Sequence, residues 1–243
     1  KLYFVKDHTD KGDISPFSSL MVALAANIGA GNIIGVGVAI AAGGPGAIFW
    51  CWLTGVLGMA TRYSEGLLAI KYRVENKDGN MSGGPMFVLE RGMKCKWLGV
   101  LFAVFTAIAA FGIGNLTQGN AAAEQLYHAF SIPAWGTATV LTALTALVML
   151  GGIRGIARVC AFFVPVMAVL YILGCMYILI VQADYILPAI RYILDCAFTG
   201  EAAAGGVVGA AVMTAMRTGV ARGLFSNEAG LGSAAIALSL IHI

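Results

Sequence analysis

Charged residues divide the chain into long apolar runs separated by polar links. No Asp, Glu, Lys or Arg occurs in residues 14–61, 97–123, 129–153 or 159–183. Each run is long enough to span a membrane, because a helix of about 20 apolar residues crosses the hydrocarbon layer. The first run is about twice that length. It contains GGPG at residues 43–46, which is typical of a tight turn, so we expect two helices there.

The pattern predicts six hydrophobic helical segments, at residues 15–43, 46–70, 97–124, 133–152, 157–182 and 206–238. All are too long for barrel strands, which alternate over about ten residues. We expect the second half of the polar link at residues 71–97 to form an amphipathic helix at the membrane interface. The link at residues 184–205 is more acidic than the link at residues 71–97. The predicted fold class is therefore an all-α integral membrane protein, with residues 1–243 forming one transmembrane domain.

Composition agrees with this prediction. The chain is 59% hydrophobic and 11% charged, whereas soluble domains are about a quarter charged. We therefore expect a lipid bilayer as its surroundings and no nucleic acid as a partner. The five cysteines and three histidines are not spaced as metal ligands or redox pairs, so we expect no such site.

Basic residues near span ends predict the orientation, because Lys and Arg accumulate on the cytoplasmic side. Placing the N-terminus inside leaves only Arg191 on the outer side. We expect a multi-pass protein of a prokaryotic cytoplasmic membrane. The basic residues assigned to the cytoplasm are Lys1, Lys6, Lys11, Arg62, Lys71, Arg73, Lys77, Arg91, Lys94, Lys96, Arg154 and Arg158.

The stretch ANIGAGNIIGVGVAI, at residues 26–40, places glycine and asparagine in the first apolar run. A dinucleotide-binding loop is excluded, since such a loop follows a strand in a soluble sheet. Gly31 and Gly35 have the spacing of a helix-packing seam. Asn27, Gly29 and Asn32 add polar groups and backbone freedom that packing does not require. They favour a broken helix, which membranes tolerate where protein or a water-filled cavity surrounds it.

A second interruption supports the broken-helix interpretation. Residues 217–234, RTGVARGLFSNEAGLGSA, place Ser226, Asn227, Glu228, Gly230 and Gly232 in the sixth segment. Transporters built from two inverted repeats carry one broken helix at the corresponding place of each repeat. Breaks in the first and sixth segments, with four uninterrupted segments between them, fit that plan.

Five stretches together resemble one family, the alanine or glycine:cation symporters of bacteria and archaea, also called sodium:alanine symporters. They are GAGNIIGVGVAIAAGGPGAIFWCW, GMATRYSEGLLAIKYR, SGGPMFVLERG, NLTQGNAAAE and GVARGLFSNEAGLGSA. The resemblance runs from about residue 15 to residue 237. It implies a leucine-transporter-type fold of ten core helices in two inverted halves. It also implies sodium-coupled import of a small neutral amino acid by alternating access, with sodium as coupling ion and no other cofactor.

Two departures from the family pattern lead to a further expectation. Family members continue past the sixth core helix, and the final LSLIHI leaves their pattern. We therefore expect a truncated chain, containing the first repeat and the broken sixth core helix, with foreign residues at its end.

The resemblance also implies site residues. Backbone amides around Gly29, Ala30 and Gly31 would receive the substrate carboxylate, unless the helix there is bent but closed. Carbonyls near the end of the first half-helix would contribute to a sodium site, and Asn32 would bind a cation or cap the second half-helix. The residues assigned to substrate are Gly29, Ala30, Gly31, Gln118, Phe225, Ser226 and Asn227, and those assigned to sodium are Ala25, Asn27, Ile28 and Asn32.

Two of these side chains have alternative interpretations. Gln118 lies in the polar stretch NLTQGN of the third segment, which favours a cavity face over plain interhelical hydrogen bonding. Phe225 would close the pocket against the substrate side chain, or would be an ordinary core residue. For the charged residues near the breaks, we expect Glu228 to pair with Arg222, and Arg62 to pair with Glu65 at the end of the second segment.

Other functions are less favoured. A membrane-embedded enzyme needs a nucleophile with a base, or a metal cluster, and the spans offer neither. A pore uses rings of charge or repeated carbonyl filters in a symmetric assembly. A proton-coupled amino-acid permease of the same fold is the nearest alternative to sodium symport.

Overall fold

The computed structural model describes residues 14–77, 80–199, 208–228 and 230–240, which form two compact units. The first unit contains the described residues up to 25, residues 65–164 and those from 232 onward. The second contains residues 26–64 and 165–231. In the described part of both units the elements are helices, apart from one short antiparallel ladder in which Val74 lies opposite Ser82.

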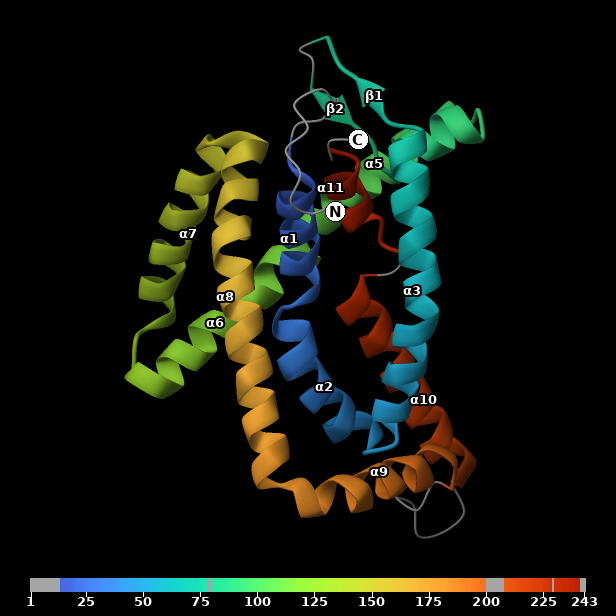
Figure 1. The fold of residues 1–243 in the computed structure, drawn as a ribbon, viewed down its shortest axis with the longest axis vertical. Helices are drawn as coiled ribbons and strands as arrows, with labels where there is room; N and C mark the ends of the chain where they lie inside the picture. The colour runs from blue at the N-terminus through green and yellow to red at the C-terminus, as the bar shows by residue number, and fades with distance from the viewer. Residues whose placement is uncertain (1–13, 78–79, 200–207, 229, 241–243) are drawn as a thin grey trace. The chain divides into compact units, whose positions relative to one another are not determined.

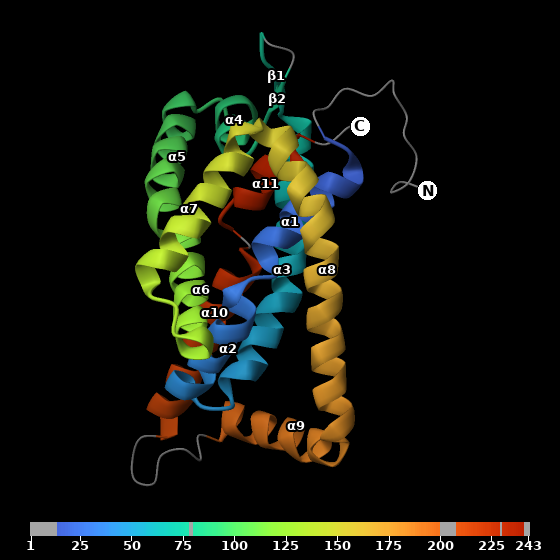
Figure 2. The ribbon, with the colours of Figure 1, turned by 90° about the vertical axis from the view of Figure 1, so that its left-hand side faces the viewer.

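The first unit follows the chain from the end of α3 to the beginning of α8, with α1 and α11 added (Figures 1 and 2). Ser19 of α1 and Ser239, just after α11, are fully buried. The Ser19 hydroxyl donates to the carbonyl oxygen of Ala237 at 3.4 Å, which ties α11 to α1. The elements are α1 (Pro16–Asn27), β1 (Val74–Glu75), β2 (Met81–Ser82), α4 (Pro85–Phe87), η1 (Val88–Gly92), α5 (Lys96–Ala109), η2 (Ala110–Gly114), α6 (Asn115–Phe130), α7 (Ala134–Leu150) and α11 (Ser233–Leu238).

The second unit is centred on a helical hairpin. Helices α2 (Ala30–Gly43) and α3 (Ala47–Lys71) are joined by a turn in which Gly44 has φ +74°, a conformation that glycine adopts readily. Helix α10 (Val208–Asn227) packs on both arms of this hairpin. Its Gly219 leaves no room for a side chain, since a Cβ there would lie 2.7 Å from Cβ of Trp50 in α3. Glycine therefore permits this close helix crossing.

Helix α9 (Ala183–Phe198) runs across the end of the hairpin in both ribbon views (Figures 1 and 2). A Cβ on Gly46 would lie 2.6 Å from the carbonyl carbon of Cys196, so α9 touches the turn directly. The ring of Phe198 packs edge-on against Phe49 of α3, with 5.0 Å between centroids. The sequence predicts a link at residues 184–205, whereas the structure has this helix over most of that range. Asp184 in its first turn suits the positive end of the helix dipole.

Most observed helices lie close to the predicted segments. Helix α3 matches the segment 46–70, and the segment 97–124 continues without a loop through α5, η2 and α6 to Phe130. The helical turns α4 and η1 occupy the second half of the first link, where an amphipathic helix was predicted. The basic residues Lys1, Lys6 and Lys11, residues 206–207 and 229 of the sixth segment and the last three residues of LSLIHI lie outside the described residues.

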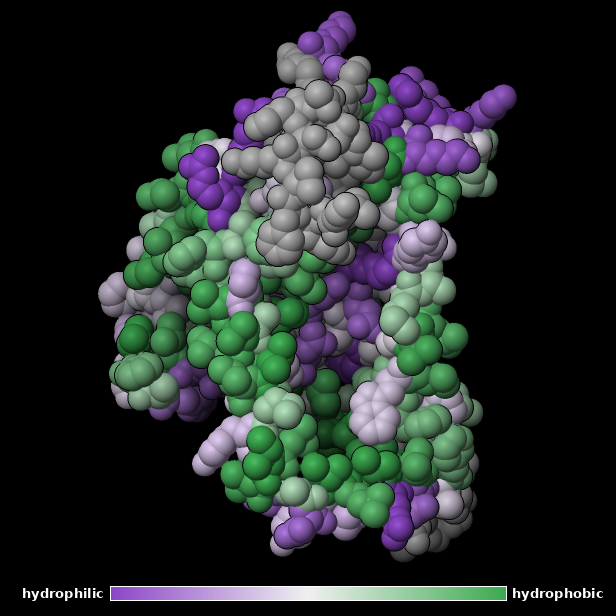
Figure 3. Space-filling model, in the orientation of Figure 1, coloured by the Kyte–Doolittle hydropathy of each residue, from purple (hydrophilic) through white to green (hydrophobic). Residues whose placement is uncertain are grey.

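Among the residues that the structure describes, two helical stretches are long and apolar enough to cross a membrane, Lys96–Phe130 and Gly152–Val181, the latter being α8. The helices Pro16–Ala25, Gly31–Gly43 and Ala134–Leu150 are apolar but shorter. Large hydrophobic side chains stand exposed along α8, and Figure 3 shows mainly hydrophobic residues over this helix. Such a surface fits lipid or further helices better than water.

Candidate functional site

The first helix break lies between α1, which ends at Asn27, and α2, which begins at Ala30. Gly29 between them has extended backbone, with φ −144° and ψ −168°. The N–H of Asn32 donates to the carbonyl oxygen of Gly29 at 3.0 Å, and its side-chain amide donates to the carbonyl oxygen of Asn27. Asn32 therefore bridges the two half-helices, and the broken helix predicted from Asn27, Gly29 and Asn32 is confirmed.

The second break follows α10, which ends at Asn227, and precedes α11. Glu228 has φ +49°, which is uncommon for a residue with a side chain. Gly230 and Gly232 also have positive φ, at +89° and +76°, so glycine permits this path. The helical interruption predicted from the glycines of this stretch is therefore confirmed.

The two breaks meet within the second unit. The Ser226 hydroxyl donates to the carbonyl oxygen of Gly31 at 3.1 Å. A Cβ on Gly31 would lie 3.4 Å from Oγ of Ser226 and 3.6 Å from Cδ1 of Phe225. Asn227 faces α3, since its Nδ2 is 3.6 Å from the Cβ position of Gly55. The structure thus brings Gly31 together with Phe225 and Ser226, three of the residues assigned to substrate.

One residue at this junction was not predicted to take part in the site. Nη2 of Arg62, in α3, donates to Oδ1 of Asn27 at 2.8 Å and lies 3.6 Å from Oε2 of Glu228. The Arg62 and Glu228 side chains are 17% and 23% exposed. The sequence predicts Arg222 as the partner of Glu228, whereas the structure places Arg62 beside this carboxylate. The sequence feature that points to Arg62 is its position, because it is the first charged residue after the charge-free run at 14–61.

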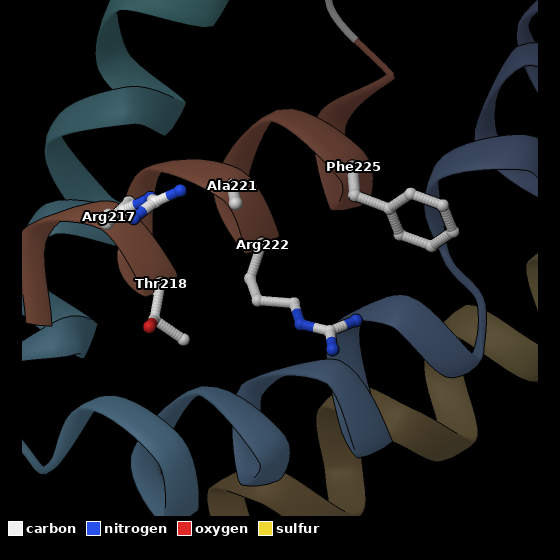
Figure 4. A pocket seen from close by; sticks show the side chains of 5 residues that line it. All are labelled: Arg217, Thr218, Ala221, Arg222 and Phe225. Atoms are coloured by element: carbon white, nitrogen blue, oxygen red, sulfur yellow. The ribbon is translucent and has the colours of Figure 1, made fainter. Parts of the chain in front are cut away.

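An open groove of about 390 Å³ lies beside the second half of α10. In Figure 4 the Arg222 side chain extends from α10 toward α2, with Phe225 farther along the same helix. Arg217 and Arg222 give the groove two guanidinium groups, and Phe225 gives it an apolar wall. The groove therefore combines anion-binding donors with a surface for apolar groups. Its lining residues are Arg217, Thr218, Ala221, Arg222 and Phe225.

The remaining predicted residues are distributed over both units. Ile28 lies in the first break, between the two half-helices. Ala25, near the end of α1, and Gln118, exposed in α6, belong to the first unit, so they are not among the residues that the second unit brings together. Within the described part of the chain, no three His, Cys, Asp or Glu side chains group as metal ligands.

Comparisons with known proteins agree with these features. The sequence profile of the sodium:alanine symporter family matches residues 1–242. A sodium/alanine symporter, AgcS of Methanococcus maripaludis, is 51% identical over 98% of this chain and 53% of its own length. An uncharacterized transporter of Haemophilus influenzae is 52% identical over 96% of this chain and 52% of its own length. A probable sodium/glutamine symporter, GlnT of Bacillus subtilis, is 38% identical over 92% of this chain and 46% of its own length.

These matches, with the helical fold and its membrane-length apolar helices, define an integral membrane protein of the transporter class. The chain belongs to the sodium:alanine symporter family. It spans about half the length of the curated relatives it matches.

Proposed function

We propose that the whole protein to which this chain belongs imports a small neutral amino acid, alanine or glycine, together with sodium. The observation that carries the proposal is the contact between the two helix breaks, Ser226 to Gly31, in a chain of this family. Broken helices that meet in a membrane expose backbone amides and carbonyls, which bind the two charges of an amino acid and a cation. The chain supplies the first repeat of a leucine-transporter-type inverted-repeat fold and its sixth core helix.

The substrate carboxylate binds at the beginning of α2 in this proposal. The first N–H groups of a helix have no partner within the helix, and the helix dipole makes this end favourable for an anion. Gly29, Ala30 and Gly31 supply these groups, and Gly31 carries no side chain to cover them. Phe225 and Ser226 stand next to Gly31 and limit the space for the substrate side chain, which favours a small amino acid.

Sodium binds on the other side of the first break in this proposal. The last carbonyls of a helix lack partners within it and form its negative end, which suits a cation. Ala25, near the end of α1, and Ile28, just after it, supply such carbonyls. Because the carbonyl oxygen of Asn27 already accepts the side-chain amide of Asn32, we assign Asn32 mainly to holding the break together. The side-chain oxygen of Asn32 completes the candidate set for sodium together with Asn27, whose Oδ1 also accepts the hydrogen bond from Arg62.

Transport then follows alternating access in a prokaryotic cytoplasmic membrane, with the N-terminus of this chain inside. Gln118 contributes a neutral hydrogen bond to the substrate from the third predicted segment. The coupling ion is sodium rather than a proton, and the site requires no cofactor beyond it.

The test is uptake of labelled alanine by the purified full-length protein in proteoliposomes. We expect accumulation with an inward sodium gradient, none when potassium replaces sodium, and competition by unlabelled glycine. Competition by unlabelled glutamine, measured in parallel, shows whether the pocket accepts a longer side chain. Uptake that follows an imposed proton gradient and ignores sodium would instead establish the proton-coupled permease.

A further inference from the structure

The guanidinium group of Arg62 contacts residues from both helix breaks. Its Nη2 donates to Oδ1 of Asn27, the last residue of α1, at 2.8 Å. The same nitrogen lies 3.6 Å from Oε2 of Glu228, the first residue after α10. Asn27 and Glu228 are far apart in sequence, and neither belongs to the helix that carries Arg62. A single side chain of α3 therefore connects the two places where the helices stop.

The surroundings make this connection stronger than an ordinary surface pair. The Arg62 and Glu228 side chains are only 17% and 23% exposed, so solvent screens their attraction incompletely. Charge-assisted hydrogen bonds are stronger than neutral ones, and arginine can bond to two acceptors at once because its donors form a rigid fork. The backbone of Glu228 is in a left-handed conformation, with φ +49°, so this residue needs support from its neighbours to stay there.

We infer that Arg62 is a positioning residue, which holds the two breaks at a fixed separation so that their backbone groups face one substrate. This inference rests on the proposed function in assuming that the breaks form the substrate site. In this inference Arg62 acts through its contacts with Asn27 and Glu228 rather than by touching substrate. When Arg62 is removed, Oδ1 of Asn27 loses this donor and the Glu228 carboxylate loses this ion pair, so both breaks gain freedom.

The experiment measures the two breaks directly, by hydrogen–deuterium exchange of the full-length protein in detergent. We expect Arg62→Gln to raise amide exchange in two peptides, one covering residues 25–32 and one covering residues 224–232. The increase should be about tenfold or more, because this is the factor that corresponds to a lost charge-assisted hydrogen bond. Glu228→Gln should raise exchange at the second break. Arg158→Gln, at an exposed arginine of α8, is the matched control and should change neither peptide.

Rescue separates positioning from a general structural defect. The charge-swapped double variant, Arg62→Glu with Glu228→Arg, keeps opposite charges together. The Asn27 amide can then donate to a carboxylate at position 62. We expect this double variant to restore low exchange at both breaks, and to restore most of the alanine affinity that Arg62→Gln loses. Increased exchange at one break only, or at neither, would overturn the inference.

The hydrogen-exchange experiment and the alanine-uptake experiment can fail independently of each other. Hydrogen exchange at the breaks requires no transport, so it decides the role of Arg62 even if the wild-type protein takes up no alanine. A wild-type protein that takes up no alanine contradicts the symport proposal instead.

Discussion

The hydroxyl of Ser226 donates a 3.1 Å hydrogen bond to the carbonyl oxygen of Gly31, although 195 positions separate the two residues. This bond joins α10 to α2 beside both breaks, and Phe225 packs at the same point. A small residue at position 31 is therefore required by the contact itself, in addition to any role in binding.

Substitution of Gly31 should abolish alanine uptake when the new side chain is branched. A Cβ at position 31 meets Ser226 and Phe225 at 3.4 and 3.6 Å, which is ordinary contact, so the two further methyl groups of valine would crowd this junction and cover the backbone amides proposed to bind substrate. We expect Gly31→Ala to keep measurable uptake and Gly31→Val to lose it, while the protein still inserts into the membrane. Uptake in proteoliposomes, corrected for reconstituted protein, measures both.

Gly35→Val is the matched control for Gly31→Val. A Cβ at position 35 meets no heavy atom within 4 Å, and the position lies about one turn farther along α2. We expect near-normal uptake from this variant. Normal transport by Gly31→Val would mean that the glycines form only a packing seam.

Gln118→Ala should weaken apparent alanine affinity by a moderate factor. One neutral hydrogen bond contributes about 0.5 to 1.5 kcal/mol net, which corresponds to roughly two- to tenfold in KM. The maximal rate should change little, since the proposed bond forms in the bound state before transport. An unchanged KM would remove Gln118 from the substrate site.

Gly219→Ala should destabilise the protein. The added methyl group would collide with the carbonyl oxygen of Ala47 and with Cβ of Trp50, so α10 must move away from α3. Overpacking of this kind reduces the free energy of unfolding by about 1 to 3 kcal/mol. Thermal unfolding of the full-length protein in detergent should show a lower midpoint. Gly174→Ala, where a Cβ meets nothing within 4 Å, should leave the midpoint unchanged or slightly raised.

Lys77 and Ile132 should lie on opposite sides of the membrane. Both are exposed, and the helical stretch Lys96–Phe130 lies between them in the chain. Single cysteines at these positions, in a background without native cysteines, should react with an impermeant maleimide from opposite sides, with Lys77 inside. Reaction of both from the same side would contradict the predicted topology.

The sequence predicted the helix breaks because their causes are local. Glycine and asparagine act on their own backbone, so clusters at residues 27–32 and 226–232 indicate interruption wherever the chain packs. Helix α9 was not predicted because Asp184, Arg191 and Asp195 give it the composition of a link. An amphipathic helix carries charged residues on its polar face, so it does not stand out as a charge-free apolar run.

The role of Arg62 could not be predicted in the same way. Sequence spacing favoured Glu65, three residues away on the same helix, as its partner. Its bond to Asn27, by contrast, spans 35 positions and depends on how α1 and α3 come together. The partners of a charged side chain follow from tertiary packing, whereas a helix break follows mainly from the residues within it.

The length of α8 has a consequence for the membrane itself. Arg154 and Arg158 occupy its first turns and favour the headgroup region, which leaves residues 159–181 for the hydrocarbon. At 1.5 Å per residue this segment measures roughly 35 Å, against a hydrocarbon thickness of about 30 Å. When α8 crosses the bilayer, this mismatch is relieved by tilting of the helix or local thickening of the lipid. Reconstitution in lipids of increasing chain length should therefore change the tilt of α8. The orientation of this helix thus depends on the thickness of the bilayer around it.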